Sequence, residues 1–222
     1  MLKQSAMHEA NSKILLQIAA KEVGTQEDPP GSNNVKYLKE AGVGPTAWCV
    51  AFVWWCFKKA GFSAALYGGK KVFYCPNVYN WAKENNLLLP INKGRPGDII
   101  LFDWEPNGVP NHVGLIESVE GSVYHTIEGN WRNMVCRVNR PMNNGVFAVI
   151  RPDYGDPPPP ELQAAELTAV PEVYTVAAGD TLFTIAQRYL GDGRRWHEIA
   201  AANNNLDPRK VSVGMKLKIP VK

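Results

Sequence analysis

A proline-rich acidic stretch divides the chain into two parts that must fold separately. Residues 152–172 carry five acidic residues, no basic residue and few large apolar ones. Four consecutive prolines, Pro157 to Pro160, favour a stiff polyproline II segment. We therefore interpret residues 152–172 as a linker between one domain over residues 1–151 and a second over residues 173–222.

The composition is that of a soluble globular protein with a mild basic charge on both sides of the linker. Hydrophobic residues make up 45% and charged residues 20% of the 222 positions. Basic residues outnumber acidic ones by 16 to 12 before the linker and by eight to four after it. This balance suits an anionic polymer such as a cell wall, and we expect no nucleic-acid partner.

The chain shows no apolar run long enough to span a bilayer and no secretory signal at its start. We therefore expect a protein made in the cytoplasm without a signal peptide and without a membrane span.

The first part changes from helical to strand-like patterning near residue 95. Apolar spacing predicts helices over residues 6–22 and 46–60, with shorter ones near 35–42 and 77–85. Short β-branched and aromatic runs then follow at residues 99–102, 112–119, 122–129, 133–140 and 145–151. Because turn residues separate them, we expect an antiparallel meander, and hence an α+β domain.

The second part has a pattern of its own. A strand at 173–176, a helix capped by Thr181, a second helix near 196–204 and a closing strand at 215–220 give a small βααβ domain.

The stretch AWCVAFVWWCF, residues 47–57, holds two of the four cysteines. Cys49 lies near the start of the predicted helix, where unpaired N–H groups and the helix dipole favour a thiolate. Cys56, two turns further on, is expected to pack as a small hydrophobe. A chain of this size does not need disulfides, so we expect mostly reduced thiols. No cysteine pair has zinc-ligand spacing, and we expect no metal and no cofactor.

A thiolate nucleophile needs a base, and His112 is the best placed of the four histidines. It opens an apolar strand and is followed by the small Gly114. An antiparallel hairpin around Gly121 would bring Glu128 beside His112, where it could hold the ring, with Asn130 nearby. The alternative is that Cys49 is an inert core thiol and that Glu128 to Asn130 is only a turn.

The motifs AWCVAFVWWC, GDIILFDW, NHVGLIESV and IEGN together resemble the cysteine, histidine-dependent amidohydrolase/peptidase (CHAP) family over about residues 19–151. The resemblance implies a papain-like domain that cuts amide bonds in peptidoglycan. It implies Cys49 as the nucleophile, His112 as the general base, Glu128 as its orienting partner and Asn130 as a supporting member. By analogy with related folds, Tyr37 would be a second oxyanion donor beside the Cys49 N–H. The closely spaced aspartates with which some members bind calcium do not occur here.

The tail, with YTVAAGDTLFTIAQRYLGD, WHEIAAANN and VSVGMKLKIP, resembles a LysM module. Such modules bind N-acetylglucosamine-containing glycans between two loops. The resemblance implies a glycan site with these residues: Gly179, Asp180, Thr181, Leu182, Asn204, Asn205 and Leu206. A purely structural alternative is that Asp180 and Thr181 only cap a helix.

Taken together, we expect a monomeric peptidoglycan hydrolase that acts on the cell wall or in the periplasm. A phage endolysin released by a holin and a bacterial wall lytic enzyme fit equally well. Two alternatives stay open: a secreted antibacterial amidase effector with an immunity protein as partner, and a wall-binding protein without activity. The sequence does not specify which amide bond is cut.

Overall fold

The computed structural model describes residues 2–155, 173–177, 179–190 and 192–220. Backbone contacts divide the chain into two compact units, residues 1–166 and 167–222. The expected polyproline II segment lies outside the described residues. Among the described helices, none combines the length and the apolar character that a membrane crossing requires.

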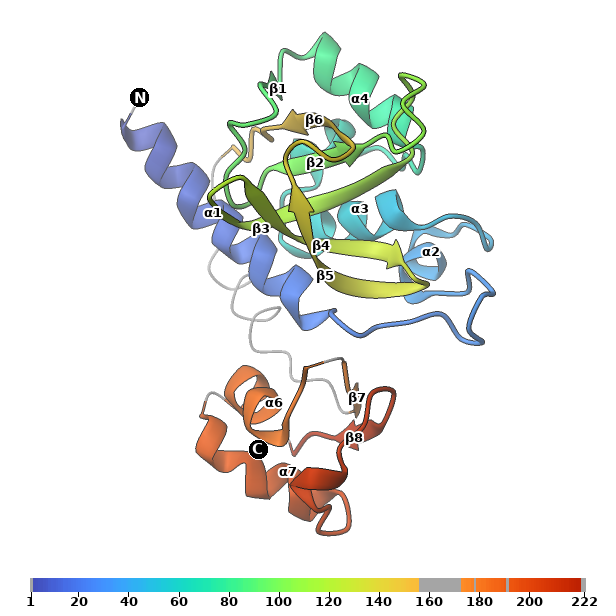
Figure 1. Cartoon of the computed structure of the whole chain (residues 1–222), viewed down its shortest axis with the longest axis vertical. Helices are drawn as coiled ribbons and strands as arrows, with labels where there is room; N and C mark the ends of the chain where they lie inside the picture. The colour runs from blue at the N-terminus through green and yellow to red at the C-terminus, as the bar shows by residue number, and fades with distance from the viewer. Residues whose placement is uncertain (1, 156–172, 178, 191, 221–222) are drawn as a thin grey trace. The chain divides into compact units, whose positions relative to one another are not determined.

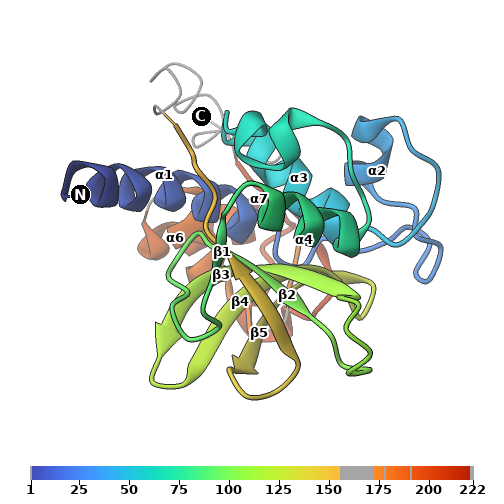
Figure 2. The ribbon, with the colours of Figure 1, turned by 90° about the horizontal axis from the view of Figure 1, so that it is seen from above.

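The first unit combines four α-helices with a six-stranded sheet (Figure 1). The helices are α1 (Leu2–Lys21), α2 (Lys36–Ala41), α3 (Cys49–Lys59) and α4 (Cys75–Glu84), with 3₁₀ turns at Ser63–Ala65 and Tyr67–Gly69. The strands are β1 (Leu88–Leu89), β2 (Ile99–Phe102), β3 (His112–Glu120), β4 (Val123–Trp131), β5 (Met134–Pro141) and β6 (Val146–Ile150). Figure 2 shows helices α1 to α4 gathered on one side of this sheet. The expected α+β class is confirmed.

The sheet has the order β1-β6-β2-β3-β4-β5 with antiparallel pairing. Strands β2 to β5 form the expected meander, but β6 returns to pair with β2 and does not continue from β5. The expectation of a simple meander is therefore correct for β2 to β5 and wrong for β6. All four side chains of β2 are buried, so β2 is an inner strand whose two edges must both be paired, and β6 pairs the second edge. The short β1 was not predicted.

Helix α3 is the centre of this unit. Nine of its eleven residues are buried, and it packs against β3 and β4. Gly129 of β4 makes this close approach possible, because a Cβ there would lie 2.4 Å from the Cβ of Phe52. Helix α3 therefore packs directly against β4, the strand that carries Glu128.

Packing of the first unit continues past Arg151, where we expected the domain to end. The ring of Tyr154 is 7% exposed and stacks on Phe57 with centroids 5.7 Å apart. Its hydroxyl donates to the carbonyl of Gly97 at 2.6 Å. Tyr154 is thus a core residue of the first unit.

The second unit is the expected βααβ arrangement: β7 (Val173–Thr175), α6 (Leu182–Tyr189), α7 (Trp196–Ala202) and β8 (Lys216–Lys218), with short 3₁₀ turns at Gly193–Arg195 and Pro208–Lys210. Strands β7 and β8 pair antiparallel. Thr181 caps α6 in a capping box with Thr184. The unit has its own core, built around Ile185, Ala186, Ile199 and Leu217.

We predict that a chain ending at Gly155 folds as a stable unit, whereas one ending at Arg151 is less stable. Losing the buried ring of Tyr154 should cost about 3–5 kcal/mol, as aromatic truncations in cores do. Urea unfolding of the two chains measures the difference. As a control, Tyr154→Phe in the longer chain removes only the hydrogen bond to Gly97 and should cost about 1 kcal/mol. Equal urea midpoints for the two chains would contradict the assignment of Tyr154 to the core of the first unit.

Candidate functional site

Cys49 is the first residue of α3, at the position expected to favour a thiolate. The preceding Trp48 is fully buried, and its indole N–H donates to Glu27 Oε1 at 2.8 Å. The other oxygen of Glu27 accepts from the backbone N–H of Asn33 at 2.9 Å. The loop between α1 and α2 therefore anchors the start of α3 and fixes where the Cys49 thiol lies.

His112 and Glu128 are neighbours, as the antiparallel pairing of β3 and β4 predicted. His112 Nε2 lies 2.9 Å from Glu128 Oε2. Gly114 supplies the space between them, because a Cβ there would lie 2.6 Å from Glu128 Cγ. Because Nε2 is engaged by Glu128, Nδ1 is the ring nitrogen left for Cys49, and the thiol and the imidazole shift each other's pKa.

The carboxylate of Glu128 has no exposed surface, and two further side chains satisfy it. Arg140 of β5 donates from Nε to Oε1 at 2.8 Å and from Nη2 to Oε2 at 2.5 Å. Thr126 Oγ1 donates to Oε1 at 2.5 Å. A buried carboxylate is stable only when such donors replace water, so Arg140 and Thr126 belong to the site. Sequence reasoning missed both residues.

Aromatic rings enclose Arg140 and His112. The Arg140 guanidinium lies 4.0 Å from the ring centroid of Trp131 and 4.7 Å from that of Trp104. Both indoles also flank His112, with centroids 5.7 and 5.5 Å from the imidazole. These rings exclude water from the carboxylate and the imidazole, which strengthens the charge interactions between them.

The pKa shifts of Cys49 and His112 favour a thiolate–imidazolium pair. A hydrogen bond from the Cys75 thiol, together with His112, outweighs burial and holds the pKa of Cys49 well below its ordinary value. Burial alone would lower the pKa of His112, but hydrogen bonds to Cys49 and Glu128 raise it to about 9. Burial opposes ionisation of Glu128 as well, but Arg140 and His112 lower its pKa. All three shifts therefore favour the charged forms, which are the thiolate, the imidazolium and the carboxylate.

Cys75 is a second thiol at this site, and no sequence pattern predicted its position there. It is the first residue of α4, and its sulfur lies 3.9 Å from that of Cys49. Cys75 is 4% and Cys49 is 7% exposed. The hydrogen bond to Cys49, together with burial, raises the pKa of Cys75, so it stays a protonated donor. All four cysteines are free thiols.

Asn130 follows Glu128 on β4 at a left-handed φ of 59°, within a register shift between Glu128 and Trp131. The described polar partner of the His112 Nε2 is Glu128, so the supporting role of Asn130 stays a prediction.

Tyr37 does not have the surroundings of an oxyanion donor. It is fully buried on α2, packs against Trp48 and Phe52, and donates its hydroxyl proton to Glu22 Oε2 at 2.6 Å. A phenol has one proton to donate, and this one is committed to Glu22. The expected oxyanion role of Tyr37 is therefore corrected to a role in the core.

In the second unit, the predicted glycan loops mix surface and core residues. Gly179 at φ 83° and Thr181 are exposed, as are Asn204 at φ 58° and Asn205 at φ 54°. Leu182 is 1% exposed and packs in the core, so its side chain lines no surface site, contrary to expectation. Leu206 is half-buried against the same core.

The carboxylate of Asp180 holds the first of these loops in shape. It accepts from the backbone N–H of Ala177 at 2.8 Å and from the hydroxyl of Tyr174, and it pairs with Arg188. Its side chain is therefore structural, but it does not cap α6; of the two residues in the capping alternative, only Thr181 is the cap. Phe183, which sequence reasoning missed, is 51% exposed directly after this loop.

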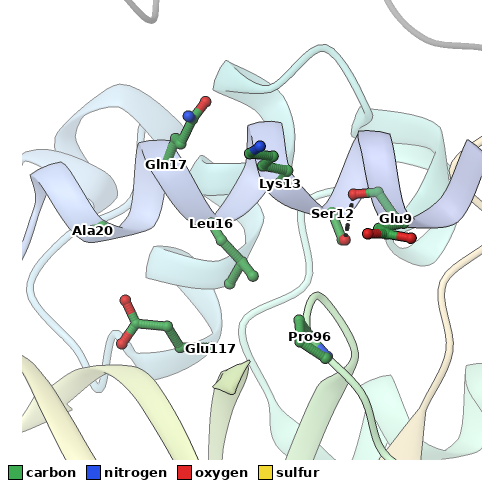
Figure 3. A pocket seen from close by; sticks show the side chains of 8 residues that line it. All are labelled: Glu9, Ser12, Lys13, Leu16, Gln17, Ala20, Pro96 and Glu117. Atoms are coloured by element: carbon green, nitrogen blue, oxygen red, sulfur yellow. Dashed lines mark hydrogen bonds between the residues drawn. The ribbon is translucent and has the colours of Figure 1, made fainter. Parts of the chain in front are cut away.

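One cavity of about 450 Å³ lies elsewhere in the first unit, between α1 and the sheet (Figure 3). Leu16 of α1 faces Glu117 of β3 across it, and Pro96 closes one side. It includes no member of the Cys49 and His112 cluster, so it is not the candidate active site. Over the described ranges, no three His, Cys, Asp or Glu side chains gather as a metal ion would require.

Comparisons with known proteins match both units. The family model of the CHAP domain matches residues 41–130, which include Cys49, His112 and Glu128 but not Arg140. That of the LysM domain matches residues 174–220. An uncharacterized protein of Deinococcus radiodurans is 46% identical over 48 residues, 22% of this chain and 19% of that protein. The chain thus spans about a fifth of the length of this relative.

Two solved structures are similar at low sequence identity. The crystal structure of Ly7917 is 17% identical, with a TM-score of 0.42, 65% of this chain and 63% of that chain being covered. The crystal structure of Ly7917 with the hydrolyzing product of MDP is 16% identical, with a TM-score of 0.42 and coverage of 64% and 62%.

We predict that the imidazole of His112 titrates near pH 9, where NMR of the labelled ring can follow it. Glu128→Gln removes the negative charge that stabilises the imidazolium, so the pKa of His112 should fall. The matched control is Glu117→Gln, which breaks the exposed Glu117–Arg137 pair and should leave His112 unchanged. Titration of wild-type His112 near its ordinary value of about 6.5 would contradict this account.

Proposed function

The chain carries a CHAP domain followed by a LysM domain, the combination of a hydrolase directed at peptidoglycan, and on that premise we propose a cysteine amidase or endopeptidase that cuts an amide bond of the wall peptide. The observation that carries this proposal is the cluster in which Glu128 holds His112 and pairs with Arg140, while His112 lowers the pKa of Cys49 at the start of α3. It joins a nucleophile, a base and an orienting carboxylate in the order that acyl transfer requires.

In the proposed mechanism, the Cys49 thiolate attacks the carbonyl carbon of a substrate amide. The developing oxyanion lies at the N-terminus of α3, where the Cys49 N–H can donate to it. His112, protonated at Nδ1, then gives its proton to the leaving amine. Water next attacks the acyl-enzyme, with the neutral imidazole as general base, and Cys49 is regenerated.

Glu128 and Arg140 act on this chemistry through His112. The carboxylate holds the imidazole by Nε2 and stabilises its charged form, so the thiolate has a counter-ion before substrate binds. Arg140 keeps the carboxylate ionised although it is buried. Neither residue is proposed to touch the substrate.

The tail is proposed to hold the enzyme on N-acetylglucosamine-containing glycan. The exposed residues Thr181, Phe183, Asn204 and Asn205 offer hydroxyl, aromatic and amide groups of the kinds that bind sugars. A tethered binding module raises the local concentration of the catalytic domain on its polymer. We propose a monomer that acts on the cell wall or in the periplasm, after holin release or dedicated secretion.

An antibacterial effector with an immunity protein as partner would use the same chemistry. A wall-binding protein without activity would not need it. The buried ionic cluster favours the enzyme, because burying charges costs stability that glycan binding by the tail does not require.

We predict that Cys49→Ala lowers the hydrolysis of purified peptidoglycan by at least about 10³-fold, because it removes the proposed nucleophile. Mass spectrometry of the released fragments measures the rate and identifies the bond that is cut. Cys56→Ala is the matched control: this thiol is buried on the same helix, and its removal should cost about 1 kcal/mol of stability but no activity. If the Cys56 variant were folded but inactive, the assignment of Cys49 as the nucleophile would be wrong.

We also predict that the tail binds chitin-like glycan through its loops and not through charge. Asn205→Gly removes an amide but keeps the left-handed backbone, and it should weaken binding by about three- to tenfold, the value of one hydrogen bond. Asn133→Gly, also at a left-handed φ but in the first unit, is the control. If binding is lost at moderate salt and N-acetylglucosamine oligomers do not compete with it, the tail binds through charge alone.

A further inference from the structure

The Cys49–Cys75 pair is a feature that the proposed hydrolysis does not require. An acyl-transfer cycle uses one thiol, and here a second one lies 3.9 Å from the first, sulfur to sulfur. The two come from different helices, each as its first residue, and no other thiol is described as hydrogen-bonded to Cys49. We propose that Cys49 and Cys75 form a reversible disulfide when a peroxide oxidises the site, and that this disulfide switches hydrolysis off.

The geometry fits such a bond. A disulfide needs its sulfurs at about 2.05 Å, so each has to move by roughly 0.9 Å if the two share the change. Small rotations of two side chains can supply that movement. The other two cysteines are not described in contact with Cys49: Cys56 lies two turns along α3, and the Cys136 thiol donates to the carbonyl of Trp131.

The chemistry balances in two steps. The Cys49 thiolate attacks one oxygen of hydrogen peroxide, the O–O bond breaks, and the hydroxide that leaves takes a proton to become water. This leaves a sulfenic acid on Cys49. The sulfur of Cys75 then attacks the Cys49 sulfur, the S–O bond breaks, and the second hydroxide leaves as water with the proton of Cys75. Two thiols lose two electrons, and one peroxide becomes two waters.

Both partners suit these roles. The thiolate is the form of cysteine that attacks peroxides, and Cys49 has His112 as its counter-ion. A site that admits a wall peptide to Cys49 also admits the much smaller peroxide. Cys75 then limits further damage, because a sulfenic acid without a neighbouring thiol proceeds to sulfinic and sulfonic acids, which a dithiol does not reverse. Peroxide access and the inhibitory consequence rest on the proposed function, but the spacing of the two sulfurs does not.

The test exposes the full chain to limited hydrogen peroxide, blocks the remaining thiols by alkylation and maps the cysteines by mass spectrometry. We expect the wild type to lose the mass of two hydrogen atoms, with Cys49 and Cys75 in one cross-linked peptide. Wall hydrolysis should fall at least about tenfold and return with dithiothreitol. Cys75→Ser should instead accumulate two or three oxygen atoms on Cys49 and not recover.

Cys56→Ala is the matched control and should behave as the wild type in every arm. Oxidation of wild-type Cys49 mainly to sulfinic acid, or its pairing with another cysteine, would overturn the inference. So would a mapped disulfide that leaves the hydrolysis rate unchanged. Failure of the proposed function is recognised separately, because a fully reduced protein would then release no wall fragments, while the mapping still reports whether the disulfide forms.

Discussion

The burial of the Glu128 carboxylate is the constraint around which the first unit is arranged. An ionised group without access to water is tolerable only if donors surround it, and here three side chains from β3, β4 and β5 supply them. The three strands must therefore pair in one register, because a slip by one residue would move these groups to opposite faces. The interaction that orients His112 thus also fixes how the sheet is built around it.

Two glycines allow this arrangement by having no side chain. Gly114 leaves room for Glu128 beside His112, and Gly129 lets Phe52 of α3 approach β4. A methyl group at either position would meet atoms at 2.6 Å or less, so the strand or the helix would have to move. The distance between the thiol of α3 and the imidazole of β3 therefore depends on residues that take no part in the chemistry.

The sequence predicted those parts of the site that local pattern controls. Hairpin pairing around Gly121 placed Glu128 beside His112, and the apolar run after Trp48 placed Cys49 at a helix start. The return of β6 to β2 and the arrival of Arg140 and Cys75 depend on contacts between distant elements, which periodicity does not encode. For Arg140 one signal existed: a buried carboxylate on a central strand requires a cation nearby. No comparable signal marked Cys75 or the commitment of Tyr37 to Glu22.

The two cysteines of α3 show how position on one helix separates a reactive thiol from an inert one. Burial raises the pKa of Cys56, and the nearby Glu22 carboxylate adds to the effect, so this thiol stays neutral. Cys49 is buried to a similar degree, but Cys75 and His112 donate to it and the N–H of Val50 contributes, which reverses the direction. Burial by itself therefore favours the neutral thiol at both positions. The difference is made by donors that only the N-terminal end of α3 meets, and one of those donors is itself a thiol. The arrangement that stabilises the Cys49 thiolate thus places an oxidisable partner beside it, so reactivity and sensitivity to peroxide have the same structural origin.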